Sequence, residues 1–187
     1  ILAGDDGVVF TRHEYEHAWS MVRTPDQKIR LAIPELLDDL ERLPSRPTTY
    51  ATDEFPFVLS AGERRSFTAN TVIRDPGWRR KDAEGALRMH PSDADDLGIS
   101  VGARVRVVTE RGAAEAVVET TDTLRRRHIT LPNGLGLDYP TDEAGSPLEV
   151  KVVGVAPNEL TAAGWRDEIA GTPWHKHVPA RVEPIPA

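Results

Sequence analysis

Residues 13 to 17 read HEYEH, which is the H-E-x-x-H motif of zinc peptidases. On a helix, His13 and His17 would lie on one face, and Glu14 could act as general base toward a zinc-bound water. Thr11 and Glu14 form a capping-box pair, so we expect a helix from Thr11 to Val22. No third histidine follows at the spacing that one subclass needs. We also expect no strands before the motif to build a cleft. We therefore interpret HEYEH as the exposed side of a charged helix.

Other metal chemistry has little support in the sequence. A later carboxylate such as Glu35 stays open as a third zinc ligand, and His175 and His177 would share one face of a strand. Two ligands alone do not make a metal site. The absence of cysteine excludes disulfides, thiolate catalysis and Cys-ligated iron–sulfur or zinc centres within this chain.

The composition is that of one ordinary globular domain with room for an appended segment. The net charge of -7 argues against binding to a nucleic-acid backbone, which requires clustered Lys and Arg. The basic runs at 79–81 and 125–127 are interpreted as solvated loop charges, with a small anion as the alternative. No apolar run approaches the ~18 residues of a membrane span, so we expect no membrane insertion. We expect a cytoplasmic protein, with which the absence of cysteine agrees. The chain begins with Ile, which we read as processing or as a piece of a longer protein.

The first fifty residues differ in texture from the rest. After the first helix we expect a turn at Pro25-Asp26 that leads into a short strand. A second helix is expected from Pro34 to Leu43, with Pro in its first turn, where the missing N–H costs nothing. A polar, proline-bearing linker follows. We place a helical segment at 1–50 and the main domain at 51–187.

From Phe55 onward the sequence predicts short strands. Arg104 to Val107 alternates charged and apolar residues before a turn at Arg111-Gly112, which predicts a hairpin. Ser92 is expected to cap a short helix that ends at Gly98 in the left-handed conformation. About six or seven strands with small helices predict a closed β barrel rather than a parallel doubly wound sheet. The expected strands are FPFVLSAGE, Leu87–Met89, the two arms of the hairpin, HITLP, VKVVGV and VPARVEPI.

Three ordered segments carry a resemblance to a known family. They are LSAGERRSFTANTVIRDP, then LRMHPSDADDLGISVGARVRVVTERG, then PNELTAAGWRDEIAGTPWHKHVPARVEPI. Together they resemble the C-terminal cofactor-binding domain of the molybdopterin oxidoreductases, which include formate dehydrogenases, nitrate reductases and dimethyl-sulfoxide reductases. The resemblance implies a six-stranded double-psi β barrel. Residues 1 to 50 resemble the segment that precedes this domain in formate-dehydrogenase-like members, which leaves HEYEH no role in zinc binding.

The resemblance implies a site for a molybdopterin guanine dinucleotide. Such a cofactor calls for backbone N–H groups at tight turns, Asn side chains and a cation. Asn158 is expected to be buried after an apolar strand, where a pterin edge or local backbone would satisfy its amide. Asp167 resembles the tail Asp of the family, although a capping role is equally open. The residues expected at the cofactor are Ser60, Ala61, Gly62, Glu63, Arg64 (or Arg65), Ser66, Asn70, Asn133, Gly134, Asn158, His175 and Lys176.

Three departures from the pattern of the family bear on these expectations. Ala61 and Glu63 stand where relatives often have Thr and Arg, so a hydroxyl is missing and the cation would come one residue later. Asn133 stands where many relatives have His, and His175 where they often have Tyr. The contacts of these four residues are therefore the least specified part of the expected site.

The implied function is cofactor binding within a larger molybdenum or tungsten oxidoreductase. We expect the metal ligand to lie in another domain, so this chain should be inert by itself and its partners should be the remaining domains, with an iron–sulfur electron-transfer partner. An alternative is a stand-alone double-psi barrel that binds proteins as an adaptor, without a cofactor. A third possibility, a self-processing decarboxylase, would use the dipeptide Gly145-Ser146.

Overall fold

The computed structural model describes residues 2–4, 7–9, 14–63, 84–136, 138–141 and 149–186. The chain divides into two compact units, residues 1–46 and residues 47–187. Each unit is described by itself below.

The N-terminal unit consists of short elements, and the expectation that no strands precede HEYEH is wrong. Strands β1 (Leu2–Gly4) and β2 (Gly7–Val9) form an antiparallel pair, and helices α1 (Tyr15–Ser20) and α2 (Pro34–Arg42) follow, with a 3₁₀ turn, η1 (Leu43–Ser45). Neither α1 nor α2 buries a residue. Helix α2 begins at Pro34 as predicted, but the strand expected after Pro25-Asp26 is wrong, because residues 27–33 are irregular. An extended segment forms a strand only where another strand can pair with its backbone.

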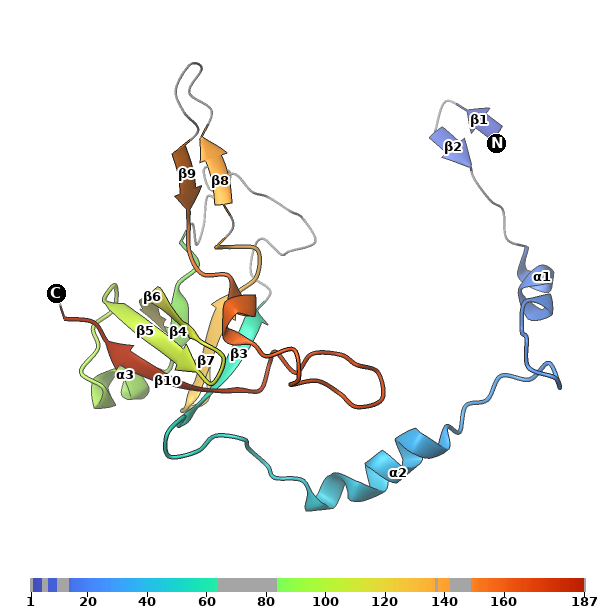
Figure 1. Ribbon diagram of the computed structural model, residues 1–187, viewed down its shortest axis with the longest axis horizontal. Coiled ribbons are helices and arrows are strands. Elements are labelled where there is room, and N and C mark those ends of the chain that lie inside the picture. Colours follow the sequence, from blue (N-terminus) through green and yellow to red (C-terminus); the bar gives the residue numbers. More distant parts are fainter. Residues whose placement is uncertain are drawn as a thin grey trace. The chain divides into compact units, whose positions relative to one another are not determined.

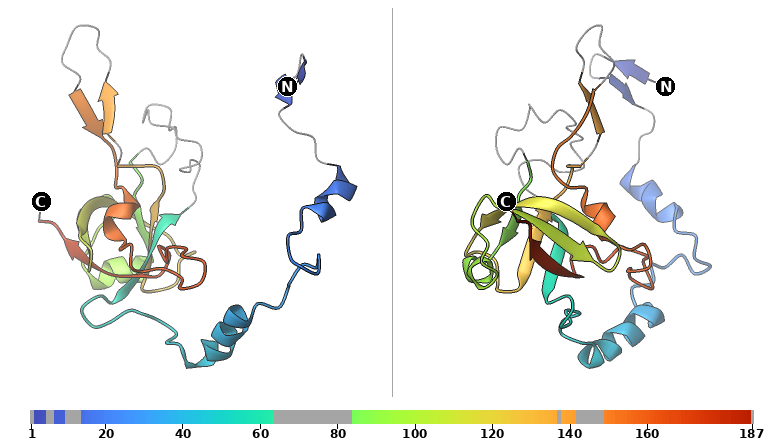
Figure 2. Two further views of the ribbon diagram at one scale, coloured as in Figure 1. Left: turned by 45° about the vertical axis from the view of Figure 1, so that its right-hand side comes forward. Right: turned by 60° about the vertical axis from the view of Figure 1, so that its left-hand side comes forward.

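Six strands of the second unit close into a barrel (Figure 1), as the sequence predicted. Their order around the barrel is β10-β3-β7-β4-β6-β5, and both views of Figure 2 show them wrapped around a common interior. Two neighbouring pairs, β3 with β7 and β4 with β6, run parallel, whereas the other described pairings are antiparallel. The strands are β3 (Phe57–Glu63), β4 (Leu87–Met89), β5 (Arg104–Thr109), β6 (Ala113–Thr120), β7 (His128–Pro132) and β10 (Val178–Pro184).

Strand alternation builds the core of the barrel. On β5, Val105 and Val107 are fully buried while Arg104 and Arg106 are exposed, as the alternating sequence predicted. The same period places Leu87 and Met89 inside on either side of the outward Arg88. The largest fully buried side chains of the described residues are Leu59, Leu87, Met89, Ile129, Leu131, Leu160, Val105, Val107 and Val118.

Two further elements flank the barrel. Strands β8 (Asp138–Thr141) and β9 (Glu149–Val152) form a separate antiparallel pair, and α3 (Pro91–Asp96) follows β4. Gly98 follows α3 with a φ of 65°, as predicted. The prediction that Ser92 caps α3 is wrong. The N-cap is His90, whose Nδ1 accepts a hydrogen bond from the backbone N–H of Ser92 at 3.1 Å, because Pro91 already occupies the first helical position.

Helix α3 supports the end at which β3 and β7 begin. The carboxylate of Asp93, 3% exposed, accepts hydrogen bonds from Arg126 Nε at 3.0 Å and from the backbone N–H of Arg127 at 2.6 Å. The carbonyl of Arg127 in turn accepts a hydrogen bond from the N–H of Val58 at 2.9 Å. Hydrogen bonds to Asp93, and then to Asp96, raise the pKa of Arg126. The basic run 125–127 therefore serves the fold at this end of the barrel.

Candidate functional site

The parallel strands β3 and β7 end side by side, and their carboxyl ends are the foundation of the candidate site. Ser60 pairs with Thr130 and Ala61 with Leu131, after which the register shifts so that Glu63 pairs with Pro132. The residue between them, Gly62, has a φ of 91°. This is a β-bulge, in which one extra residue turns the end of β3, and glycine adopts the required left-handed backbone without strain.

Gly62 also allows Asn133 to lie directly against the bulge. A Cβ atom at Gly62 would lie 2.4 Å from Asn133 Oδ1, closer than real atoms approach. The backbone N–H of Asn133 donates to the carbonyl of Glu63 at 3.2 Å, so the loop after β7 is tied to the end of β3. Among the described residues, the half-buried side-chain amide of Asn133 has no hydrogen-bond partner. Its donor and acceptor are thus available to a ligand.

The loop after β7 also contacts the segment that leads to η4 (Pro157–Leu160). Gly136, with a φ of 69°, packs so closely on this segment that a Cβ would lie 2.0 Å from the backbone N of Ala156. Its N–H donates to the carbonyl of Val153 at 2.8 Å. Residues distant in sequence therefore meet at the carboxyl ends of β3 and β7.

Asn158 lies in η4, but the prediction that it is buried is wrong. In a 3₁₀ helix, residues three apart lie on the same side, so Pro157 and Leu160 both face the core. Asn158 and Glu159 consequently face solvent. The amide of Asn158 is therefore an exposed group that a ligand could contact. Because it is exposed to water, it needs no hydrogen-bond partner within the protein.

The C-terminal tail joins the same group through its backbone. The carbonyl of His175 accepts a hydrogen bond from the N–H of Ala61 at 2.7 Å, which fixes the tail beside β3. The side chain of Lys176 is exposed and has no partner among the residues that the structure describes. Residues 174–177 form a turn, with the N–H of His177 bonded to the carbonyl of Trp174 at 3.2 Å, so the expected strand for His175 and His177 is wrong.

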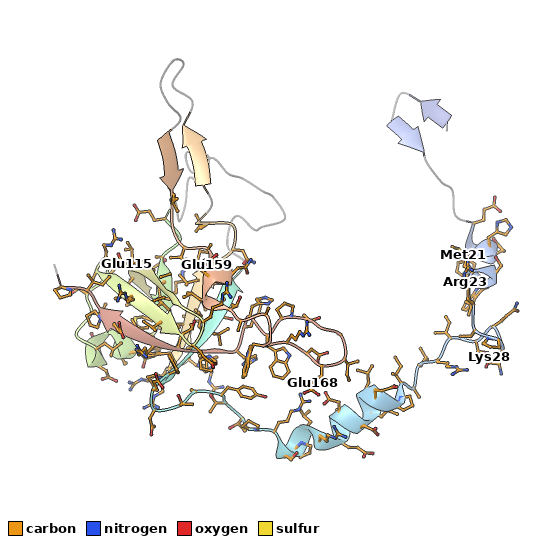
Figure 3. All side chains as sticks on the ribbon, viewed as in Figure 1. Met21, Arg23, Lys28, Glu115, Glu159 and Glu168 are labelled. Atoms are coloured by element: carbon orange, nitrogen blue, oxygen red, sulfur yellow. The ribbon has the colours of Figure 1, made fainter. Side chains whose placement is uncertain are left out.

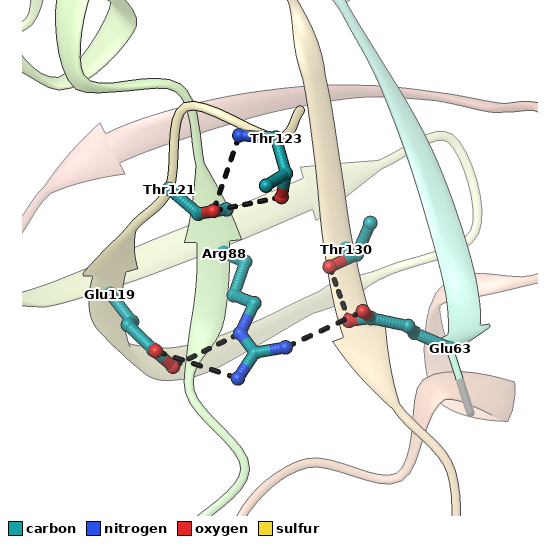
Figure 4. Close-up of polar contacts among 6 residues, drawn as sticks. All are labelled: Glu63, Arg88, Glu119, Thr121, Thr123 and Thr130. Carbon is teal, nitrogen blue, oxygen red and sulfur yellow. Dashed lines mark hydrogen bonds and ion pairs between the residues drawn. The ribbon is translucent and has the colours of Figure 1, made fainter. Parts of the chain in front are cut away.

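The side chain of Glu63 is already engaged by the protein. Its Oε2 accepts a hydrogen bond from Thr130 Oγ1 at 2.6 Å, and its Oε1 lies 3.5 Å from Arg88 Nη1 (Figure 4). The carboxylate therefore belongs to the outer wall of the barrel, and it is the backbone of Glu63 that reaches the candidate site.

The structure thus brings most of the expected residues together. Ser60, Ala61, Gly62 and Glu63 lie at the end of β3, Asn133 and Gly134 at the end of β7, and His175 beside Ala61. Asn158 and Lys176 lie on the two segments that contact this end. Arg64, Arg65, Ser66 and Asn70 lie outside the described residues. The tail residue Asp167 caps a turn, since its Oδ1 accepts hydrogen bonds from the N–H groups of Ile169 and Ala170.

Two hollows adjoin η4. One, of about 500 Å³, is lined by Gly136 and Ala156 and carries the carboxylates of Glu115 and Glu159, both labelled in Figure 3. The other, of about 800 Å³, is mostly apolar and lies between the start of β10, the β5–β6 turn and residues 50–55.

Among the residues that line the larger hollow are Tyr50 and Trp165, which the sequence did not predict at a site. Tyr50, Trp165 and Trp174 form a cluster with ring centroids 5.0 to 5.9 Å apart. In the described part of the chain, Trp165 Nε1 is the buried side-chain donor without an acceptor. Only the spacing of two tryptophans within the tail hinted at this cluster.

The HEYEH motif has no metal-binding geometry in the described residues. The side chains of Glu14 and His17 are 73% and 77% exposed and lie 3.9 Å apart, and His13 lies outside the described residues. No group of three or more potential ligands that could hold a metal occurs in the part of the chain that the structure describes. In the same part, no helix is both long and apolar enough to cross a bilayer. The dipeptide Gly145-Ser146 lies outside the described residues.

Comparison with known proteins shows what this barrel is. Residues 57–179 match the family described as the molybdopterin dinucleotide-binding domain. The chain belongs to that family. The match contains every expected cofactor residue from Ser60 to Lys176, and it begins at β3. The cofactor that domains of this family bind is a molybdopterin dinucleotide.

A solved structure supports the fold independently. The acetylene hydratase from Pelobacter acetylenicus is similar over 87% of this chain and 24% of its own, with a TM-score of 0.59 and 19% sequence identity. At this identity the likeness shows the fold alone. The chain spans about a quarter of the length of that hydratase.

The residues at the carboxyl ends of β3 and β7 fit such a dinucleotide. The amides of Asn133 and Asn158 each donate and accept, as the mixed edge of a pterin requires. The absence of a side chain at Gly62 leaves room for the amide of Asn133, which packs on the bulge. Lys176, whose ammonium has no partner in the described part of the chain, offers a cation for a phosphate or pterin oxygen.

Proposed function

We propose that the dinucleotide binds at the carboxyl ends of β3 and β7. The observation that carries this proposal is the convergence of three separate segments: the bulge at Gly62, the loop at Asn133 and the tail at His175 are joined by direct contacts. A stand-alone adaptor would have no need to bring these segments together, with amides and an ammonium that no other described residue binds.

Each residue has a distinct role in this proposal. Ala61 and Gly62 supply backbone at the closest approach, Asn133 and Asn158 bind the pterin edge, and Lys176 neutralises negative charge. His175 fixes the tail through its carbonyl, which bonds to Ala61, and its half-buried ring borders the site. Arg64, Ser66 and Asn70 are proposed to extend the same site.

We propose further that this chain is one domain of a molybdenum or tungsten oxidoreductase of the formate-dehydrogenase type. The bound group would supply two-electron chemistry at its metal, whose protein ligand we place in another domain. The chain itself would hold and cover the cofactor and would be inert alone. We also propose an iron–sulfur electron-transfer partner and a cytoplasmic location.

The native protein tests the proposal about the parent enzyme. Isolating the endogenous protein that carries this sequence gives its intact mass and its bound metal. We expect a chain several times longer than this one, with about one molybdenum or tungsten per copy. A metal-free chain of about this length would contradict the proposal and favour the adaptor alternative.

A further inference from the structure

Four side chains on four neighbouring strands form a polar row across the outer face of the barrel (Figure 4). Arg88 on β4 lies at the centre, with its Nε 3.1 Å from Glu119 Oε2 on β6 and its Nη1 3.5 Å from Glu63 Oε1 on β3. The hydroxyl of Thr130 on β7, the strand between β3 and β4, donates a hydrogen bond to Glu63 Oε2 at 2.6 Å. We call these residues the Arg88 row.

The phase of β3 shows why the row and the bulge depend on each other. Leu59 and Ala61 face the core, so an uninterrupted strand would also point Glu63 inward. The extra residue at Gly62 reverses this phase and places Glu63 outside, where Thr130 and Arg88 receive it. The contacts of Glu63 in turn hold the end of β3 in its bulged form.

The bulge is also the point at which Asn133 contacts β3. Asn133 is held there by its N–H bond to the carbonyl of Glu63 and by its close packing on Gly62. A shift of Glu63 would therefore move both the left-handed backbone and the amide that faces the ligand.

We propose that Arg88 is a positioning residue for the dinucleotide. Through Glu63, Arg88 holds the bulge at Gly62 and the amide of Asn133 in the arrangement that receives the cofactor. Glu119 holds the guanidinium of Arg88 in place. This inference rests on the proposed function, because it assigns the ligand to the same end of the barrel. Arg88 itself does not touch the ligand.

The barrel offers a matched control for Arg88. Arg181 on β10 also bridges two glutamates, with its Nε 2.7 Å from Glu183 and its Nη1 3.4 Å from Glu54. The side chains of Arg88 and Arg181 are similarly exposed, at 30% and 36%. Among the described residues, the side chain of Arg181 contacts Glu54, Glu183 and Phe55 and not the bulge. R181Q should therefore remove a comparable pair of surface ion pairs without moving the site.

The test compares the 187-residue chain with its R88Q and R181Q variants. The probe is metal-free, oxidised molybdopterin guanine dinucleotide, whose pterin fluorescence reports binding. We expect R88Q to weaken binding about tenfold, the lower end of the range known for residues that orient ligands at metal sites. R181Q should bind like the wild type. The amide NMR signals of Gly62 and Asn133 should shift in free R88Q and stay in place in R181Q.

The outcomes separate this inference from the proposed function. If the wild type binds and R88Q binds equally well, the positioning role is overturned and the function stands. If the wild type does not bind, the proposed function fails, and the NMR signals of Gly62 and Asn133 decide whether Arg88 holds the bulge. Should R88Q not fold, E119Q replaces it, with E183Q as its control, under the same criteria.

Discussion

Polar side chains lie at both ends of the parallel pair β3–β7, but the two ends differ in whether other groups of the protein pair with those side chains. At the end where the strands begin, Asp93 is buried, and its carboxylate is saturated by Arg126 and the N–H of Arg127. At the end where they finish, the amide of Asn133 has no partner among the described residues. The same holds for the side chains of Asn158 and Lys176, which lie on the two segments that contact this end.

This difference separates structural polar residues from candidate binding residues. A buried charge is tolerated only when other groups of the protein pair with it, and Asp93 meets this requirement completely. Polar groups gathered at one place without such partners are available to a ligand. Two glycines differ in a similar way, because a Cβ added at Gly136 would meet the backbone of Ala156 whereas one added at Gly98 would meet no atom within 4 Å.

The first prediction uses this pair of glycines and has the largest expected effect. A Cβ at residue 136 would overlap the backbone N of Ala156, so Gly136→Ala combines an unfavourable φ with a steric clash. We expect it to lower the free energy of unfolding by about 3 kcal/mol. Gly98→Ala meets no atoms and should cost about 1 kcal/mol, the strain of the left-handed backbone alone. Denaturant unfolding of both variants measures this, and equal losses would contradict the packing described for Gly136.

The second prediction concerns the opposite end of the strand pair. Asp93→Ala leaves the N–H of Arg127 without its acceptor and should lower the free energy of unfolding by about 2 kcal/mol. Asp95→Ala, on the exposed side of the same helix, should change it by less than about 0.5 kcal/mol. Dinucleotide affinity, measured on the folded fraction, should be unchanged in both. A loss of affinity in the Asp93 variant alone would mean that the two ends are not functionally separate.

The third prediction has the smallest expected effect on stability and addresses the site directly. Asn133→Ala removes an amide that has no partner in the described part of the protein, so its unfolding free energy should change by less than about 0.5 kcal/mol. Its dinucleotide affinity should fall about tenfold, the loss of roughly one hydrogen bond to a ligand. Calorimetric titration and thermal unfolding of the same sample measure both quantities. Unchanged affinity would remove Asn133 from the site.

Local sequence patterns predicted much of the barrel. The alternation from Arg104 to Val107 gave the β5–β6 hairpin, and the Gly at 98 marked the end of α3. These features depend on neighbours within a few residues, so they can be read from a single sequence.

The parts that failed depend on tertiary partners. The engagement of Glu63 requires Arg88 and Thr130 on other strands, and the exposure of Asn158 follows from a 3₁₀ turn whose inward residues, Pro157 and Leu160, are selected by the core. The strand expected after Pro25 was wrong for a related reason. No strand lies beside that segment among the described residues.

The central claim, that the dinucleotide binds where β3 and β7 end, is tested most directly by mapping the ligand on the protein. Amide NMR spectra of the ¹⁵N-labelled chain are recorded during titration with molybdopterin guanine dinucleotide. We predict that the largest shifts will fall on Ala61, Gly62, Asn133 and His175, and that Arg127 and the residues of α3 will stay in place. Shifts centred on α3 and the start of β7, with none at the bulge, would contradict the claim.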